Sequence, residues 1–210
     1  MATVTVSTPT PTDVSFGVPY RLSSSDYFRM VEAGIIPPER RVGLWEGQLY
    51  EKMAKKIAHA GVQNLLITAF VRMLPAGWSV WVESPILVDD FSAPLPDLAV
   101  VRGDARDYMH RGTVPRAEEI GLVVEVSDST LKKDLGETLR TYARAGLATY
   151  WVVNLVSRRV EVYSRPVTEG DSAGYQSCES FEPGVDVPVS LGGVEAARVA
   201  VRDLLPEESR

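Results

Sequence analysis

The sequence predicts a single α/β (α+β) domain in which a mixed β-sheet lies between helices. Two short apolar runs, PDLAVV from Pro96 and GLVVEV from Gly121, are typical of strands that are covered on both faces. Two longer stretches, residues 52–74 and 131–145, place their apolar side chains at helical spacing. Because the 210 residues contain no internal repeat and no second set of such patterns, we expect one domain.

The composition limits the partners that the chain can bind. A formal net charge of −6 provides no overall basic field, so a polyanion would need a local basic patch or bridging metal ions. The single cysteine, Cys178, cannot form an internal disulfide, which suits a reducing cytosol and predicts a cytoplasmic protein. No apolar run approaches the ~18 residues of a membrane span, so we expect no membrane partner.

The beginning of the chain predicts a tail and then a short helix. Residues 1–20 are rich in Thr, Ser and Pro and lack the basic and apolar regions of a signal peptide, so we expect a flexible tail before a domain at 21–210. SSSDYFRMVEAG then predicts a helix that begins at Ser25 or Asp26 as N-cap and ends at Gly34.

The next elements are a hairpin, a long helix and the first strands. RVGLWEGQLYE alternates around Gly47 as a tight hairpin does. In residues 52–74 the apolar face of a helix comprises Val62, Leu65, Leu66, Ala69, Phe70 and Met73. WSVWVESPILVDD predicts one or two strands interrupted at Pro85. The polar segment RGDARDYMHRGTVPRAEEI between the two apolar runs predicts a loop or an irregular excursion.

The last third predicts a second helix and several strands. Residues 131–145 form the helix, and Gly146 is its C-terminal cap. TYWVVNL and RRVEVYS predict a strand pair that turns near Ser157, and YQSCESF, DVPVSL and ARVAVRDLL predict short strands and a final helical turn.

Two acids interrupt the apolar runs, Asp97 at the start of one predicted strand and Glu125 within the other. A buried carboxylate is costly to ionise without compensating charge or hydrogen bonds. If the two strands are neighbours, both acids converge, and then one carries a proton or a cation lies between them. Oxygen ligands of this kind favour Mg²⁺. The alternative is that each acid pairs with a nearby arginine or caps a turn.

Several segments together resemble the Uma-type (Uma-two) restriction-endonuclease family of the PD-(D/E)XK superfamily. They lie between about Arg41 and Pro166: VGLWEGQLYE, VESPILVDD, PDLAVV, VVEVSDSTLKKDLGETLRTYARAGLATYWVVNL and RRVEVYSRP. The resemblance implies a restriction-endonuclease-like core, a mixed β-sheet flanked by helices, with a divalent-metal site at the strand ends.

The resemblance also implies roles for particular residues. Asp97 and Glu125 correspond to the metal-binding acids, and the backbone carbonyl of Val126 is the third metal ligand. The cofactor would be Mg²⁺ or Mn²⁺, which polarises the scissile phosphate and activates a water. The family places a further acid in an early element, where Glu46 is the best match and Glu51 the second, unless both are surface acids of the hairpin.

His59 extends the inward stripe of the long helix, because it precedes Val62 and Leu66 at helical intervals. Its side chain is either a half-buried histidine with a hydrogen-bond partner or a group that faces the metal site. The family tends to carry a histidine at this place after a proline-containing turn, whereas this chain has KKIAH.

The lysine of the superfamily is missing. Ser127 stands in the strand position of that lysine, and Thr138 stands in the helix position that the family uses, four residues after Asp134. At ~100° per residue, Lys132 and Lys133 lie roughly 120–140° around the helix from position 138, so either could substitute only if the helix begins late. Otherwise both are solvated surface lysines.

Three functions are therefore compatible with the sequence. They are a Mg²⁺-dependent endonuclease that cleaves DNA, a binding module for nucleic acid or protein that keeps the nuclease fold without cleavage, and a domain whose acids only pair internally. Two basic clusters either follow a phosphate backbone or are ordinary surface: Lys52, Lys55 and Lys56, and Arg102, Arg106 and Arg111. Double-strand cleavage often requires two copies, so a homodimer is a further option.

Overall fold

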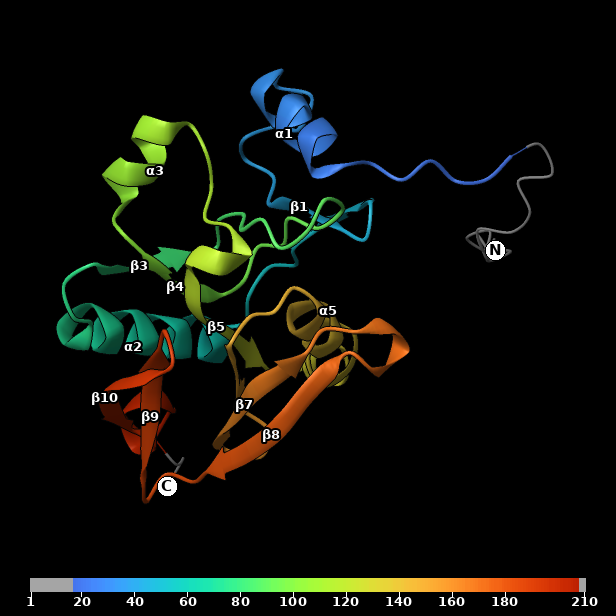
Figure 1. Ribbon diagram of the computed structural model, residues 1–210. Helices are drawn as coiled ribbons and strands as arrows, with labels where there is room; N and C mark the ends of the chain where they lie inside the picture. Colours follow the sequence, from blue (N-terminus) through green and yellow to red (C-terminus); the bar gives the residue numbers. More distant parts are fainter. Residues whose placement is uncertain (1–16, 208–210) are drawn as a thin grey trace, which may run out of the picture.

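The computed structural model of the protein describes residues 17–207. Its centre is a six-stranded sheet in the order β3-β4-β5-β6-β7-β8 (Figure 1). Neighbouring strands are antiparallel except β5 and β6, which are parallel. The strands are β3 Trp78–Val82, β4 Leu98–Arg102, β5 Ile120–Ser127, β6 Thr149–Asn154, β7 Arg159–Val167 and β8 Gly174–Phe181. The predicted mixed sheet is thus confirmed.

Helices and two hairpins surround this sheet. The helices are α1 Ser24–Glu32, α2 Ile57–Met73, α3 Ala105–Arg111, α4 Leu131–Lys133 and α5 Leu139–Arg144, with a π-helical turn at Asp134–Thr138 joining the last two. The hairpins are β1 Val42–Trp45 with β2 Gln48–Glu51, and β9 Asp186–Leu191 with β10 Val194–Ala200. Short 3₁₀ turns lie at Ala117–Glu119, Gly170–Ser172 and Val201–Leu204.

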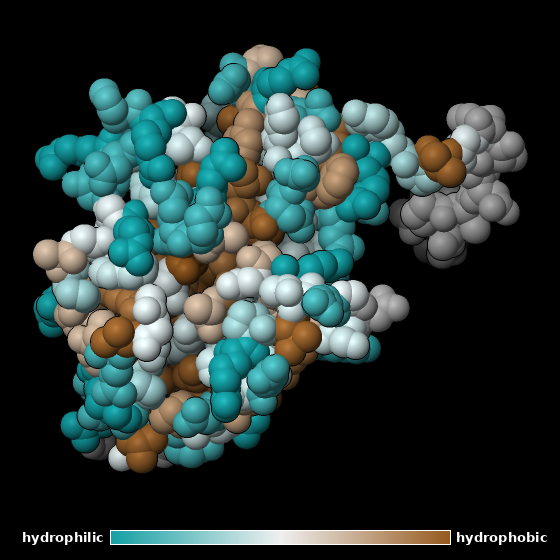
Figure 2. Space-filling model, in the orientation of Figure 1, coloured by the Kyte–Doolittle hydropathy of each residue, from teal (hydrophilic) through white to brown (hydrophobic). Residues whose placement is uncertain are grey.

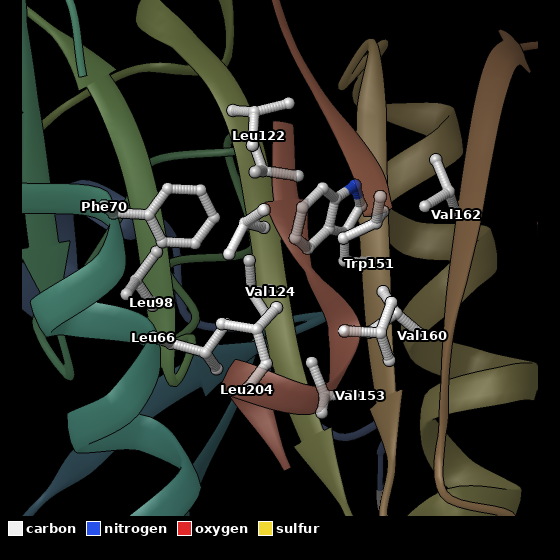
Figure 3. Close-up of a cluster of buried hydrophobic side chains, with 14 of the residues drawn as sticks. Leu66, Phe70, Leu98, Leu122, Val124, Trp151, Val153, Val160, Val162 and Leu204 are labelled. Atoms are coloured by element: carbon white, nitrogen blue, oxygen red, sulfur yellow. The ribbon is translucent and has the colours of Figure 1, made fainter. Parts of the chain in front are cut away.

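One face of the sheet packs against α2 and the β9–β10 hairpin. Leu66 and Phe70 of α2 lie in one buried cluster with side chains of β4, β5 and β6 (Figure 3). The ring of Phe70 is 5.7 Å from that of Trp151, and Leu204 belongs to the same cluster. The predicted apolar face of the long helix therefore packs on the sheet through Val62, Leu66 and Phe70. Leu65, which the spacing assigned to the same face, is instead 40% exposed.

The opposite face packs against α3 and the helical segment that contains α5. Ala99 and Val123 of the central strands lie in a buried cluster with Tyr142 of α5. Because side chains alternate along a strand, Asp97 and Glu125 belong to this face, each two residues from a member of the cluster. The sheet thus directs both acids toward α5.

The α1 helix and the β1–β2 hairpin form a third buried cluster above the sheet. Tyr27 and Leu44 belong to it, and the Tyr27 hydroxyl donates to the carbonyl oxygen of Val42 at 2.8 Å. In the space-filling view, hydrophilic side chains cover most of the visible face, and hydrophobic ones show mainly in the recess across its middle (Figure 2).

Several predicted boundaries were wrong. The N-cap of α1 is Ser23, and Asp26 completes its capping box. The polar segment predicted as a loop contains α3, which Asp104 and Asp107 start with a capping box and Gly112 ends. The long helix begins at Ile57, so residues 52–56 are not helical.

Two predictions about the ends and the environment of the chain have different outcomes. The predicted tail falls outside the described residues up to position 16, and residues 17–20 contain no helix or strand. No helix within residues 17–207 combines the length and the apolar character needed to cross a membrane.

Candidate functional site

Asp97 and Glu125 lie side by side because of the register between β4 and β5. These strands are antiparallel and pair Leu98 with Val124, so the next step of the register sets Asp97 opposite Glu125. The backbone N–H of Asp97 donates to Glu125 Oε2 at 3.3 Å. The predicted convergence of the two acids is therefore confirmed.

Four nitrogen atoms surround the carboxylate of Asp97, whose side chain is 2% exposed. Lys52 Nζ lies 2.7 Å and Lys55 Nζ 3.1 Å from Oδ1, while the backbone N–H of Val126 donates to Oδ2 at 2.8 Å. His59 Nε2 lies 3.1 Å from Oδ2. Burial alone would raise the pKa of Asp97, but His59 and the two ammonium groups outweigh it and hold the pKa below its ordinary value.

Glu125 has a different environment. The hydroxyl of Tyr142 donates to its Oε1 at 2.9 Å, and Lys52 Nζ lies 3.8 Å from its Oε2. Burial raises the pKa of Glu125 to about 8; the positive charge of Lys52 opposes this rise, and the negative charges of Asp97 and Asp134 support it. The two acids therefore titrate apart, with Asp97 the stronger acid.

A further ion pair holds Lys55 at the edge of the site. Its ammonium group lies 2.8 Å from Glu83 Oε1 and donates to Gln63 Oε1 at 2.7 Å. Gln63 in turn donates to the backbone carbonyl of Asp97 at 2.7 Å, and Arg41 pairs with Glu83 at 2.6 Å. These contacts connect the start of α2 to the start of β4.

The π-helical turn determines which side chains face Glu125 from the helix. A π-helix bonds residue i to residue i+5, so Lys133 and Thr138 come onto one side instead of lying far apart around an α-helix. Asp134, at the start of the turn, accepts hydrogen bonds from Ser127 at 2.7 Å and Thr130 at 2.6 Å. Burial raises the pKa of Asp134, against these two hydrogen bonds.

These groups surround a cavity of about 330 Å³. It opens between the β2–α2 connection, the ends of β4 and β5, and the helix that follows β5. The side chains that line it include Tyr50, Lys52, His59, Asp97, Glu125, Lys133, Thr138 and Tyr142. The cavity therefore brings together acids, cations and aromatic side chains from four parts of the sequence.

The predicted site residues divide into two groups. Asp97, Glu125, Val126, His59 and Lys133 all line the cavity. The ammonium of Lys133 lies over the rings of Trp45 and Tyr50, 5.1 and 5.2 Å from their centroids.

Glu46 and Lys132 lie elsewhere. Glu46 is at the tip of the β1–β2 hairpin, where its carboxylate pairs with Arg144 at 2.8 Å, outside the cavity lining. Lys132 is exposed on α4 and does not line the cavity. Glu51, the second candidate for the early acid, lines the cavity but forms an ion pair with Arg40.

Sequence reasoning gave Lys52 and Lys55 only a possible role along a phosphate backbone, with ordinary surface as the alternative, and it assigned no site role to Gln63, Glu83 or Asp134. The contacts of the two lysines with Asp97 were missed because the apolar spacing was extended back to residue 52, which placed both lysines on the long helix. A signal was available, since Ile57 is preceded by Lys56, which provides no side-chain cap, and no Ser, Thr, Asp or Asn stands nearby to begin a helix at 52. For Glu83 and Asp134 no local signal existed.

Few side chains of the cavity could bind a metal ion through oxygen. Among the residues that the structure describes, no group of three or more His, Cys, Asp or Glu side chains is placed to hold a metal ion. A metal would therefore depend on the two carboxylates, on backbone oxygen and on water.

Comparison with known proteins agrees with this architecture. The sequence model of the Uma2 family, described as "Putative restriction endonuclease", matches residues 24–201. Among solved structures, "a putative nuclease belonging to DUF820" from Anabaena variabilis ATCC 29413 is similar with a TM-score of 0.56 and 17% identity, covering 78% of this chain and 88% of that chain. At this identity the similarity shows the fold alone. No curated protein matches the chain.

Proposed function

This chain belongs to the Uma2 family, whose description is "Putative restriction endonuclease", and we propose that it hydrolyses phosphodiester bonds in DNA with a divalent metal ion held at Asp97 and Glu125. The observation that supports this most is the hydrogen bond from the Asp97 N–H to the Glu125 carboxylate, which joins the two acids at one wall of the cavity. The register of β4 and β5 places the two acids opposite each other, so that both carboxylates can bind one ion.

These oxygen ligands would suit Mg²⁺ or Mn²⁺. Mg²⁺ in proteins commonly takes one or two carboxylates and keeps several waters, which agrees with two acids beside a cavity of about 330 Å³. The carbonyl of Val126 is the proposed third ligand. Its N–H donates to Asp97, and an extended residue directs its N–H and C=O to the same side of the strand.

Several residues of the chain would prepare the reaction. Tyr142 fixes one oxygen of Glu125, and the N–H of Val126 fixes one oxygen of Asp97. His59 reaches Asp97 from the first turn of α2 and lines the same cavity, where it could contact the phosphate or the attacking water. A bound Mg²⁺ or Mn²⁺ would polarise the phosphate and lower the pKa of a water for in-line attack.

Nicking of supercoiled plasmid tests this proposal. We expect nicking that requires Mg²⁺ or Mn²⁺, stops on chelation and falls by at least ~10²-fold in Asp97→Asn, since a lost electrostatic contact to the reacting centre costs this much. Glu179→Gln on the exposed side of β8 is the matched control and should cleave as the unchanged protein does. Equal cleavage by Asp97→Asn, or none by the unchanged protein with either metal, would refute the proposal.

A non-cleaving binding module is the second candidate. Two points favour it: Thr138 stands where the resemblance to the family implies a lysine, and groups of the chain itself already contact both oxygens of Asp97. It predicts that the protein retards DNA in a gel at low salt without cleaving it, because phosphate contacts strengthen as salt is lowered. Retardation that is lost between about 50 and 200 mM salt, with no metal-dependent product, would favour this candidate over the nuclease.

A further inference from the structure

We propose that Lys52 is the active-site cation of this chain and takes the role that the family lysine would have at position 138. The inference rests on the proposed nuclease function. It concerns which side chain touches the scissile phosphate, and it moves this role from the helix after β5 to the end of β2 on the opposite wall of the cavity.

The position of the Lys52 ammonium supports this role. Lys52 directly follows β2, and its Nζ lies 2.7 Å from Asp97 Oδ1 and 3.8 Å from Glu125 Oε2. The side chain is 18% exposed and lines the cavity. Lys52 thus contacts both proposed metal ligands and still reaches the space where a substrate would bind.

The number of N–H donors on the Lys52 ammonium group also supports this role. An ammonium group has three N–H donors. Lys52 gives one to the backbone carbonyl of Leu95 at 2.8 Å and one to Asp97 at 2.7 Å. Glu125 Oε2, at 3.8 Å, is too far for a hydrogen bond, so the third N–H is available to a phosphate oxygen or a water.

Two other lysines near the cavity are less suited to this role. Lys55 has three acceptors within 3.1 Å, from Gln63, Glu83 and Asp97, and these use all of its donors. Lys133 lies over the rings of Trp45 and Tyr50, where a cation–π contact holds its charge against the cavity wall.

The chemical step needs no proton from Lys52. In the hydrolysis, the oxygen of a water forms a bond to phosphorus while the bond from phosphorus to the leaving oxygen breaks. The attacking water releases one proton to solvent, and the leaving oxygen takes up one proton from solvent. Lys52 stays protonated and donates to a non-bridging phosphate oxygen, whose negative charge increases in the transition state.

The decisive comparison uses Lys52→Met, Thr138→Lys and the double variant, with Lys132→Met as a surface control. We expect Lys52→Met to lower kcat by ~10²–10³-fold. Calorimetry should show Mn²⁺ binding that is unchanged or tighter, because a competing cation has been removed. Thr138→Lys introduced into Lys52→Met should restore at least a tenfold rate, since Thr138 lines the same cavity. A merely structural lysine would not be replaced from the opposite wall.

Other outcomes overturn the inference in distinguishable ways. If Lys52→Met cleaves within threefold of the unchanged protein, or if the folded double variant binds Mn²⁺ and is not rescued, Lys52 is not the cation although the nuclease remains. If the unchanged protein shows no metal-dependent cleavage, both proposals fail. If Lys52→Met does not fold, Lys52→Gln, which keeps one donor to Leu95 without the charge, is measured in its place and must show the same loss.

Discussion

Asp97 is a buried carboxylate whose ionised form is held by its neighbours. Its two oxygens contact two ammonium groups, a histidine and a backbone N–H. These ion pairs and hydrogen bonds offset the cost of burying the ionised carboxylate. Lys55 contacts Glu83 and Gln63 as well as Asp97, so it connects three side chains at the edge of the site.

Lys55→Met should therefore destabilise the protein. The substitution leaves Gln63 Oε1 without its donor and removes one of the cations beside Asp97 and Glu83, which predicts a loss of about 1–3 kcal/mol in the free energy of unfolding. Urea unfolding followed by circular dichroism measures it. Lys56→Met is the matched control: Lys56 is 69% exposed and pairs only with Asp128 in the contacts described, so we expect a change below about 0.5 kcal/mol. Equal stability of the two variants would contradict the assignment of Lys55.

Asp97 and Glu125 could be predicted from the sequence, but the lysines that pair with them could not. Asp97 and Glu125 stand out because a carboxylate is unexpected in an apolar strand. Lys52 and Lys55 do not stand out, since lysines before a helix are usually solvated, and only the fold shows that the extended segment 52–56 turns toward β4. Residue type alone therefore identified Asp97 and Glu125 but not the lysines that pair with them.

At the scale of elements, strands and the apolar face of α2 followed the patterns, whereas helix starts and internal irregularities did not. The polar helix α3 has no apolar periodicity, although its capping box of Asp104 and Asp107 was a usable signal. The π-helical turn at Asp134–Thr138 has no sequence signature. The estimate that Lys133 lies far around the helix from position 138 assumed a regular α-helix. It was wrong because the π-helical turn brings Lys133 and Thr138 to the same cavity.

The pairing of β6 with β7 contains a further buried acid, Glu161, which gives a pH-dependent prediction. Glu161 on β7 is 4% exposed and accepts hydrogen bonds from Asn154 at 3.0 Å, Arg159 at 2.9 Å and Tyr163 at 2.8 Å. Burial would raise its pKa, but the hydrogen bonds from Asn154, Tyr163 and Arg159 outweigh burial and lower it from its ordinary value of 4.5.

Glu161→Gln should cost about 1–3 kcal/mol of stability at pH 7, where the carboxylate is ionised in both the folded and unfolded chain. A lowered folded pKa means that this stabilisation is present above pH 4.5 and is lost as the pH falls through the folded value. The difference in unfolding free energy between the two proteins should therefore shrink below pH 4.5. A difference that stays constant between pH 7 and pH 3 would show that the charge of Glu161 contributes nothing.

At the scale of the whole molecule, the net charge and the site give opposite expectations for a polyanion. The chain carries a formal charge of −6, yet the cavity concentrates Lys52, Lys55, Lys56 and Lys133 near its acids. A divalent ion would add two positive charges at the same place. DNA binding should then depend on the local site and on the metal, because the overall field of the protein opposes it.

Metal binding at the site should also stabilise the fold as a whole. An ion that binds only the folded protein adds about 2.7 kcal/mol at a concentration of 100 Kd, and a chain of this length gains about 2–4 °C in Tm per kcal/mol. We therefore expect Mn²⁺ to raise Tm by roughly 5–10 °C in scanning calorimetry, with full reversal by a chelator. Asp97→Asn should lose the shift, because the substitution replaces one of the two proposed carboxylate ligands with a neutral amide. An equal shift in Asp97→Asn would place the ion elsewhere on the molecule and remove the thermodynamic basis for a metal at the junction of β4 and β5.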